Sequence, residues 1–408
     1  MEFIDNINEK EYKEFLLKND SHFMQTIEFG EIRKKKGFNY HLVGLKDKKK
    51  LIATALLLEK RLPFNLKYFY VPRGYTIDYT NREILKEFTD NLYNYCKKQK
   101  AIFLKIDPPI IRYTQDTDGN KLDGTDNTDL INYLKKIGYK HLGFNINFDN
   151  EQPRFTFRID IDKDINDVYK NFHATTRKVL NKKNQYNLDI YIGNKDDIKD
   201  FYLTMEETSK REGIIQAPLS YYENFYEIFN NSNMSDIYIV KGNINQLKEE
   251  FKKEISDTEK IQDVNPVKIK EKENKLNKLN KILNELNEIN EEEITLASII
   301  TVKYKDMVWT VHGGNNSKLM SLNANYLLYY QIISDANKNG YKKVDLFGAC
   351  GNPNPEVTNP IYGIHSFKKR LGGEYTEFIG EFDLITNKFM YILYKLYTKT
   401  RNKIKKRK

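Results

Sequence analysis

Residues 294–312, ITLASIITVKYKDMVWTVH, contain two strand-like segments separated by a turn. Apolar and β-branched residues dominate both Ile294–Lys303 and Met307–His312, as is typical of strands in a buried sheet. Lys305-Asp306 between them is a polar turn of the kind that joins antiparallel neighbours. The stretch therefore predicts a β-hairpin, and what precedes and follows it decides the fold class.

The same order of predicted elements occurs twice along the chain. In the first half, strands are predicted at 40–45, 51–58 and 66–71, then a helix at 82–98 and a strand at 101–106. In the second half, a strand at 236–241 precedes the hairpin, and a helix at 323–339 and a strand at 343–347 follow it. We interpret this order as an internal duplication of a mixed α/β (α+β) module with an antiparallel start and a crossover helix. This is the pattern of GNAT-type acyltransferases, so the predicted fold is two tandem GNAT-like modules.

A long helical segment interrupts the second module. Leu276, Leu279, Leu283 and Leu286 repeat at spacings of 3, 4 and 3, which is typical of a coiled-coil seam. Pro266 separates this helix from an earlier one that contains Leu247. The pattern predicts an antiparallel coiled-coil hairpin at 243–293, a first GNAT-like domain at 1–150, and a second one made of 151–242 and 294–408.

Composition restricts the class of protein and its partners. The 408 residues carry a net charge of +10, which favours anionic partners, although it could also reflect a Lys- and Asn-rich genome. Two cysteines exclude a disulfide scaffold and fit a reducing cytoplasm. The N-terminus lacks the apolar core of a signal peptide, and apolar runs are too short to span a bilayer. We therefore expect a cytoplasmic protein.

Neither module contains the glycine-rich loop that holds the diphosphate of coenzyme A in ordinary acetyltransferases. The nearest candidates, Pro72-Arg-Gly74 and Gly313-Gly314, are too short to surround a diphosphate. The histidines also lack metal-ligand spacing. The sequence thus predicts no cofactor, no metal, and an acyl donor other than acetyl-CoA.

Several motifs, taken in order, resemble the Fem family of peptidoglycan-bridge aminoacyltransferases. They are Met24-Gln-Thr-Ile-Glu-Phe-Gly-Glu-Ile-Arg33, Tyr70-Val-Pro-Arg-Gly74, Leu104-Lys-Ile-Asp-Pro108, Gln152-Pro-Arg-Phe-Thr156, Phe367-Lys-Lys-Arg-Leu-Gly-Gly373 and Glu377-Phe-Ile-Gly-Glu-Phe-Asp383. The resemblance implies transfer of an amino acid (Gly, Ala or Ser) from aminoacyl-tRNA to the side-chain amine of the peptidoglycan stem peptide. The acceptor would be lipid II or the UDP-MurNAc-pentapeptide precursor, and the protein a monomer. Two alternatives stay open: a non-catalytic RNA-binding or scaffold protein, and an N-acyltransferase that uses another activated donor.

Such a reaction needs a group that handles the proton of the attacking amine. Asp107 directly follows a predicted strand, where a module of this fold opens its cleft. It could act as the catalytic base or hold the ammonium group in place, or it could simply cap the turn before Pro108.

The substrates are anionic, and basic residues are therefore the candidate ligands. The resemblance implies that Arg33, Lys36, Arg211 and Tyr222 bind the phosphates and sugar of the precursor. Arg177 and Lys178 in a predicted first helical turn, and Lys368, Lys369 and Arg370 beside Phe367, are candidates for binding tRNA. A structural helix and a solvated basic loop are the competing interpretations.

The helical hairpin and the C-terminus extend beyond the two modules. The hairpin could enlarge the tRNA-binding surface, but its glutamates would repel phosphate, and contact with another protein is the alternative. Tyr391, Tyr394 and Tyr397 have helical spacing and precede a Lys- and Arg-rich end. This segment could lie on the inner face of the membrane, follow RNA, or be a solubilising tail.

Overall fold

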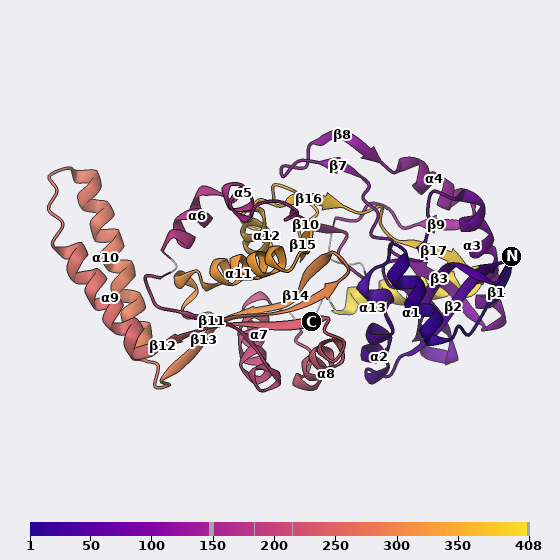
Figure 1. The fold of residues 1–408 in the computed structure, drawn as a ribbon, viewed down its shortest axis with the longest axis horizontal. Coiled ribbons are helices and arrows are strands. Elements are labelled where there is room, and N and C mark those ends of the chain that lie inside the picture. The colour runs from indigo at the N-terminus through magenta and orange to yellow at the C-terminus, as the bar shows by residue number, and fades with distance from the viewer. Residues whose placement is uncertain (147–150, 183, 214, 406–408) are drawn as a thin grey trace. The chain divides into compact units, whose positions relative to one another are not determined.

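The computed structural model describes residues 1–146, 151–182, 184–213 and 215–405 (Figure 1). The chain forms two compact units, which are described separately here. Unit 1 consists of Met1–Arg158, Phe347–Ser366 and Glu374–Lys408, and unit 2 of Ile159–Leu346 and Phe367–Gly373. No helix in the described ranges combines the length and apolar character needed to cross a bilayer.

Unit 1 is built on a sheet whose described strands follow the order β1-β2-β3-β4-β6-β17-β9, with β5 pairing to β3. Their bounds are β1 (Glu2–Ile4), β2 (Asn39–Asp47), β3 (Lys50–Arg61), β4 (Lys67–Val71), β5 (Thr76–Ile77), β6 (Ala101–Ile106), β9 (Tyr139–His141) and β17 (Phe382–Ile385). Strands β4 and β6 run parallel because helix α3 (Arg82–Lys98) crosses between them. Leu85, Phe88, Leu92 and Cys96 of α3 recur at helical spacing and are buried in the core.

The remaining elements of unit 1 surround this sheet. The helices are α1 (Glu9–Lys18), α2 (Ile27–Lys35), α4 (Thr128–Lys136), most of α12 (Tyr362–Lys369), and α13 (Lys388–Lys405). Strands β7 (Tyr113–Gln115) and β8 (Lys121–Asp126) form a small separate ladder. Strand β16 (Glu374–Glu377) pairs antiparallel with β10 (Phe155–Asp160) from Phe155 to Arg158.

Unit 2 repeats the same topology. Strands β11 (Asp189–Gly193), β12 (Ser235–Asn243), β13 (Glu293–Tyr304) and β14 (Met307–Asn315) pair antiparallel in sequence, and β15 (Lys343–Gly348) then pairs parallel to β14. Helix α11 (Ala324–Lys338) makes the crossover, as α3 does in unit 1. Helices α5 (Ile165–Lys170), α6 (Ala174–Asn181), α7 (Ile198–Glu212) and α8 (Leu219–Asn230) complete the unit. The prediction of a duplicated GNAT-like α/β fold is confirmed.

Gly314 has a packing role in unit 2. A Cβ atom at this position would lie 2.5 Å from the backbone nitrogen of Met205 and 2.6 Å from the Thr204 hydroxyl. Strand β14 can therefore approach helix α7 this closely only because residue 314 has no side chain.

The segment between β12 and β13 forms two helices, α9 (Ile244–Glu259) and α10 (Pro266–Asn287), which lie side by side in Figure 1. Two contacts show that the helices run antiparallel: Lys275 pairs with Glu254 at 3.0 Å, and Lys272, earlier in α10, donates to the carbonyl of Glu259, later in α9, at 2.7 Å. Leu279 and Leu286 of the predicted stripe are buried, and so is Ile282 beside them. The hairpin is thus observed, while coiled-coil packing between its helices stays a prediction.

The unit boundaries differ from the predicted domain boundaries in three segments. Residues 151–158, 347–366 and 374–408 were expected in the second domain but fall in unit 1. For 374–408, the reason is pairing over a long sequence separation: Phe382 of β17 is in register with Ile106 of β6, and Leu384 with Leu104.

Candidate active site

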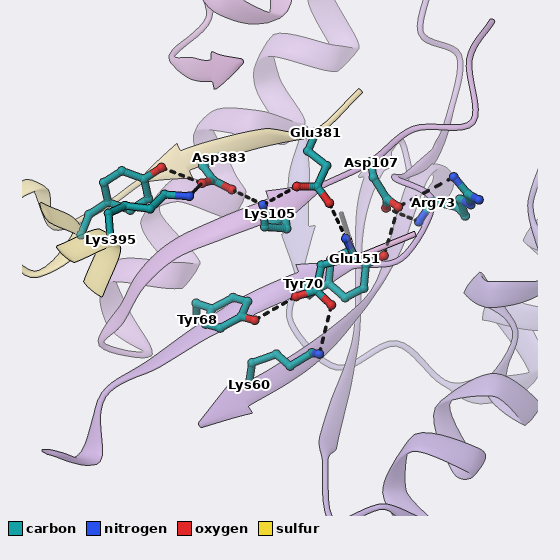
Figure 2. Close-up of polar contacts among 11 residues, drawn as sticks. Lys60, Tyr68, Tyr70, Arg73, Lys105, Asp107, Glu151, Glu381, Asp383 and Lys395 are labelled. Atoms are coloured by element: carbon teal, nitrogen blue, oxygen red, sulfur yellow. Dashed lines mark hydrogen bonds and ion pairs between the residues drawn. The ribbon is translucent and has the colours of Figure 1, made fainter. Parts of the chain in front are cut away.

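Asp107 follows the last residue of β6 and is 4% exposed. Its backbone position beside β4 brings it next to Tyr70 and to the Pro72-Arg-Gly74 loop. The Tyr70 hydroxyl donates to Asp107 Oδ2 at 3.1 Å, and the Arg73 backbone N–H donates to Oδ1 at 2.7 Å. Both carboxylate oxygens therefore have fixed partners, and the geometry of the group is well defined (Figure 2).

Burial raises the pKa of Asp107 to about 7, against the opposing effect of the nearby Arg73 guanidinium and with a further increase from Glu381. A carboxyl group that titrates near neutral pH can both accept and release a proton there, as a general base must. An ordinary turn-capping aspartate, with its pKa near 4, would hold a proton much more weakly.

The Pro72-Arg-Gly74 loop supports Asp107. Arg73 has a left-handed conformation (φ 60°), and its guanidinium donates to the Pro153 carbonyl at 3.1 Å. Gly74 has φ 72°, and a Cβ atom there would lie 2.6 Å from the Tyr79 hydroxyl and 3.0 Å from Pro108 Cγ. Gln25 donates from its side-chain amide to the Pro72 carbonyl at 2.6 Å. These contacts hold the Pro72-Arg-Gly74 loop in the position where its backbone N–H at Arg73 reaches Asp107.

A second buried network of charged residues is centred on Lys105 of β6, two positions before Asp107 (Figure 2). Lys105 pairs with Glu381 at 2.9 Å and with Asp383 at 3.1 Å. Burial alone would lower the pKa of Lys105, but these two carboxylates raise it above its usual range, so the lysine stays charged. Glu381 in turn accepts from the Glu151 backbone N–H at 2.6 Å.

Glu151 connects the network to a group of cations. Its carboxylate accepts from Tyr68 at 3.0 Å and pairs with Lys60 at 3.3 Å. Lys60 also lies 5.7 Å from the centre of the Tyr70 ring. Burial and the charges of Arg33 and Lys60 lower the pKa of Lys36 to about 8.

Unit 1 therefore combines the predicted residues Arg33 and Lys36 with Lys60 in one cationic cluster. Arg33 stacks over the Phe29 ring at 4.8 Å, and its buried Nε atom has no hydrogen-bond partner among the described residues.

Arg211 and Tyr222 both belong to unit 2. Arg211 donates to Glu212 at 2.9 Å and to the Ser317 hydroxyl at 3.0 Å. Tyr222 is 3% exposed and packs against Phe201 and His312. Such burial disfavours the predicted role of Tyr222 in substrate binding, because its ring offers little surface to a ligand.

The two predicted tRNA-binding segments are neighbours in unit 2. The backbone N–H of His173 and the hydroxyl of Thr176 both donate to the Arg370 carbonyl, at 2.9 and 3.0 Å. Arg177, however, donates to the Lys170 carbonyl at 2.7 Å, and the His173 side chain caps the N-terminus of α6. These contacts favour the structural interpretation of Arg177, while Lys178 beside it stays a candidate for binding tRNA.

The Phe367–Arg370 segment is only partly a surface. Lys368 is 8% exposed, and burial lowers its pKa to about 8 against the attraction of Asp345. Phe367 packs on Tyr326 and Tyr329. Of the three predicted cations, Arg370 is exposed and Lys369 half-buried, and these two remain candidates for binding tRNA.

Sequence reasoning missed Lys60, Glu151 and Glu381 as members of the network. Glu381 and Tyr70 each belong to a recognised motif. The contacts of Glu381 with Lys105 and of Tyr70 with Asp107, however, depend on strand pairing, which the motifs do not reveal. Lys60 and Glu151 had no distinguishing local signal. Within the described ranges, His, Cys, Asp and Glu side chains do not gather in threes or more as a metal site would require.

A sequence model of the FemAB family matches residues 7–399 of the chain. The chain belongs to the FemAB family. The chain is similar to the lipid II:glycine glycyltransferase of Staphylococcus aureus strain MRSA252. The two are 26% identical over 410 residues, which cover 95% of this chain and 94% of the relative. The protein of the same name from S. aureus strain N315 is 26% identical over 391 residues, covering 91% and 89%. The crystal structure of FemX superposes with a TM-score of 0.76 at 24% identity and covers 96% of this chain and 99% of FemX. Family and fold are thus as the motifs predicted.

Proposed function

We propose that this FemAB-family chain transfers an amino acid from aminoacyl-tRNA to the side-chain amine of a peptidoglycan stem peptide carried by lipid II or a related precursor. The observation that supports it most is Asp107, a buried carboxyl group with a pKa of about 7 and two fixed hydrogen-bond partners. The full-length likeness to glycyltransferases that act on lipid II supports the acceptor and favours glycine as the amino acid.

The chemistry requires proton transfers but no covalent enzyme intermediate. The acceptor amine, with an ordinary pKa of about 10.4, must lose a proton to attack the ester carbonyl of the aminoacyl-tRNA. A C–N bond then forms, and the ester C–O bond to the tRNA ribose breaks. The proton that makes the amine neutral before the attack is released to solvent. Asp107 would take the second proton, which the nitrogen loses as the C–N bond forms, and deliver it to the leaving ribose oxygen. Its pKa near 7 suits both steps.

The cationic cluster would bind the precursor. Arg33, Lys36 and Lys60 offer positive charge against phosphate, and the charges of Arg33 and Lys60 already act on Lys36. We also propose that Arg211 binds a phosphate of the precursor, and that Lys369, Arg370 and Lys178 bind tRNA.

The test is a transfer assay with three labelled donors, glycyl-, alanyl- and seryl-tRNA, and detergent-solubilised lipid II. We expect RNase-sensitive incorporation from glycyl-tRNA that is lost in Asp107→Asn. Free labelled glycine with the same lipid II is the control. Incorporation that survives RNase would favour another activated donor. Binding of tRNA with no incorporation from any donor would favour the non-catalytic RNA-binding alternative.

A further inference from the structure

The C-terminal helix α13 (yellow in Figure 1) has one face packed on unit 1. The Tyr391 hydroxyl donates to Asp383 at 2.7 Å, and its ring lies 5.3 Å from that of Phe103. The Tyr394 ring lies 5.4 Å from Phe103 and 5.8 Å from Tyr68. Tyr391 and Tyr394 therefore fix the rotation of the helix about its axis.

The opposite face of α13 is apolar and exposed. Its members, with their exposed fractions, are Phe389 (66%), Ile392 (58%), Leu393 (44%), Leu396 (57%) and Tyr397 (45%). Their spacing of i, i+3, i+4, i+7 and i+8 places them on one continuous stripe. Scattered exposed apolar residues are ordinary on a protein surface. Five exposed apolar side chains along one side of a single helix instead indicate a binding surface.

The charged residues in the sequence of this segment are all cations, one of which, Lys395, pairs with Asp383 of β17 at 3.5 Å. The sequence from Lys388 to Lys408 contains nine Lys or Arg residues and no Asp or Glu. Lys388, Lys395 and Lys399 recur at i, i+7 and i+11, which places them along one border of the stripe. An apolar stripe edged by cations is the pattern of helices that lie in the interface of an anionic membrane.

We propose that α13 docks unit 1 onto an anionic lipid surface, with Phe389, Ile392, Leu393 and Leu396 entering the boundary between headgroups and acyl chains. This function is separate from amino-acid transfer and does not depend on it. The two would nevertheless be connected, because Tyr391 bonds Asp383, and Asp383 pairs with Lys105 in the network beside Asp107.

The test is flotation of the full-length protein with vesicles of phosphatidylcholine, with or without phosphatidylglycerol. We expect binding to the vesicles that contain phosphatidylglycerol, weakened by added salt. Ile392→Gln/Leu396→Gln should weaken it by about tenfold, since two half-exposed aliphatic side chains lose their burial. The matched control is Leu17→Gln/Leu203→Gln, which changes two comparably exposed leucines elsewhere (66% and 58%) and should bind as wild type does.

Thermal unfolding of each variant checks that it is folded. If the double variant is destabilised, Ile392→Gln alone replaces it, and a smaller loss of vesicle binding is then expected. Equal binding by wild type and the Ile392/Leu396 variant, or no binding by wild type, overturns the proposal. So does a variant that instead loses tRNA binding or self-association while still floating with vesicles. Transfer to detergent-solubilised lipid II should be unchanged in this variant, which separates a failure of docking from a failure of the transfer function.

Discussion

Arg73 contacts Asp107 twice: its backbone N–H donates to one carboxylate oxygen at 2.7 Å, and its guanidinium lies 3.9 Å from the other. The backbone contact is possible because Arg73 adopts a left-handed conformation, which few non-glycine residues do. Local strain of this kind often marks a functional site. Here it directs a donor at the carboxyl group that the proposed reaction needs.

Replacing Asp107 by Asn should lower the rate of transfer by about 10² to 10⁴, the usual contribution of a general base. The amide keeps the volume and can still accept from the Arg73 N–H, so the fold should be retained. Single-turnover transfer to lipid II measures the effect, and Asp123→Asn, at an exposed position in β8, is the matched control. A loss smaller than about threefold would mean that Asp107 only caps its turn.

The raised pKa of Asp107 also predicts a pH dependence of stability. Burial raises it from 3.8 to about 7, so the contribution to stability is fully present below pH 3.8 and is lost as the pH rises through 7. The loss is at most about 4 kcal/mol, at 1.36 kcal/mol for each pKa unit. Between pH 5 and pH 8, the free energy of unfolding should therefore fall more in wild type than in Asp107→Asn. Urea titrations at the two pH values measure this difference, and parallel changes would contradict the assignment.

Gly74→Ala should destabilise the protein by about 1 to 3 kcal/mol and impair transfer, because it combines a left-handed φ with contact to Tyr79 and Pro108. Gly37→Ala is a matched control, since Gly37 has φ 83° but nothing within 4 Å of the added Cβ. It should cost only about 1 kcal/mol and leave transfer unchanged. Equal effects of the two substitutions on transfer would show that the tight fit at Gly74 is unimportant.

Lys60→Gln should raise the KM for the precursor by about tenfold, with a smaller change in kcat, if the cationic cluster binds phosphate. Steady-state kinetics with varied lipid II measure both constants. Lys13→Gln removes a similarly paired but half-exposed lysine, which bonds Glu28, and should have no effect. A change in kcat alone would instead connect Lys60 with the chemistry, through Glu151 and Tyr70.

Replacing Ile244–Glu292 by Asn-Gly should leave a folded protein, because Asn243 and Glu293 are paired neighbours that a two-residue turn can join. If the hairpin contacts tRNA, the KM for aminoacyl-tRNA should rise about tenfold while the KM for the precursor does not change. Cooperative thermal unfolding checks the fold. An unchanged KM for tRNA would favour contact with another protein.

Much of the fold could be predicted because its signals are local. Apolar periodicity located the strands, the crossover helices and the helical hairpin, and their order revealed the duplication. The pairing of β17 with β6 could not be predicted, because the strands lie far apart in sequence and neither carries a mark of its partner.

The site was predictable to a lesser degree. Asp107 and Arg33 were predicted as site residues because the recognised motifs include them, and these roles stay predictions. Lys368 and Arg177 resembled surface cations in the sequence. A buried lysine, or an arginine that donates to backbone carbonyls, cannot be told from a solvated one by sequence alone. The sequence could not reveal the burial of Tyr222 either, because an aromatic residue suits a ligand site and a core equally well.

The salt bridge between Lys105 and Glu381 joins residues 276 positions apart, and this has a consequence for biosynthesis. While the ribosome is still making the second half of the chain, unit 1 lacks β17, and Lys105 lacks both of its carboxylate partners. A charged lysine could not be buried there at a tolerable cost. The network around Lys105 can therefore form only after synthesis has passed Asp383, so that chains terminated before β17 would be unable to assemble it.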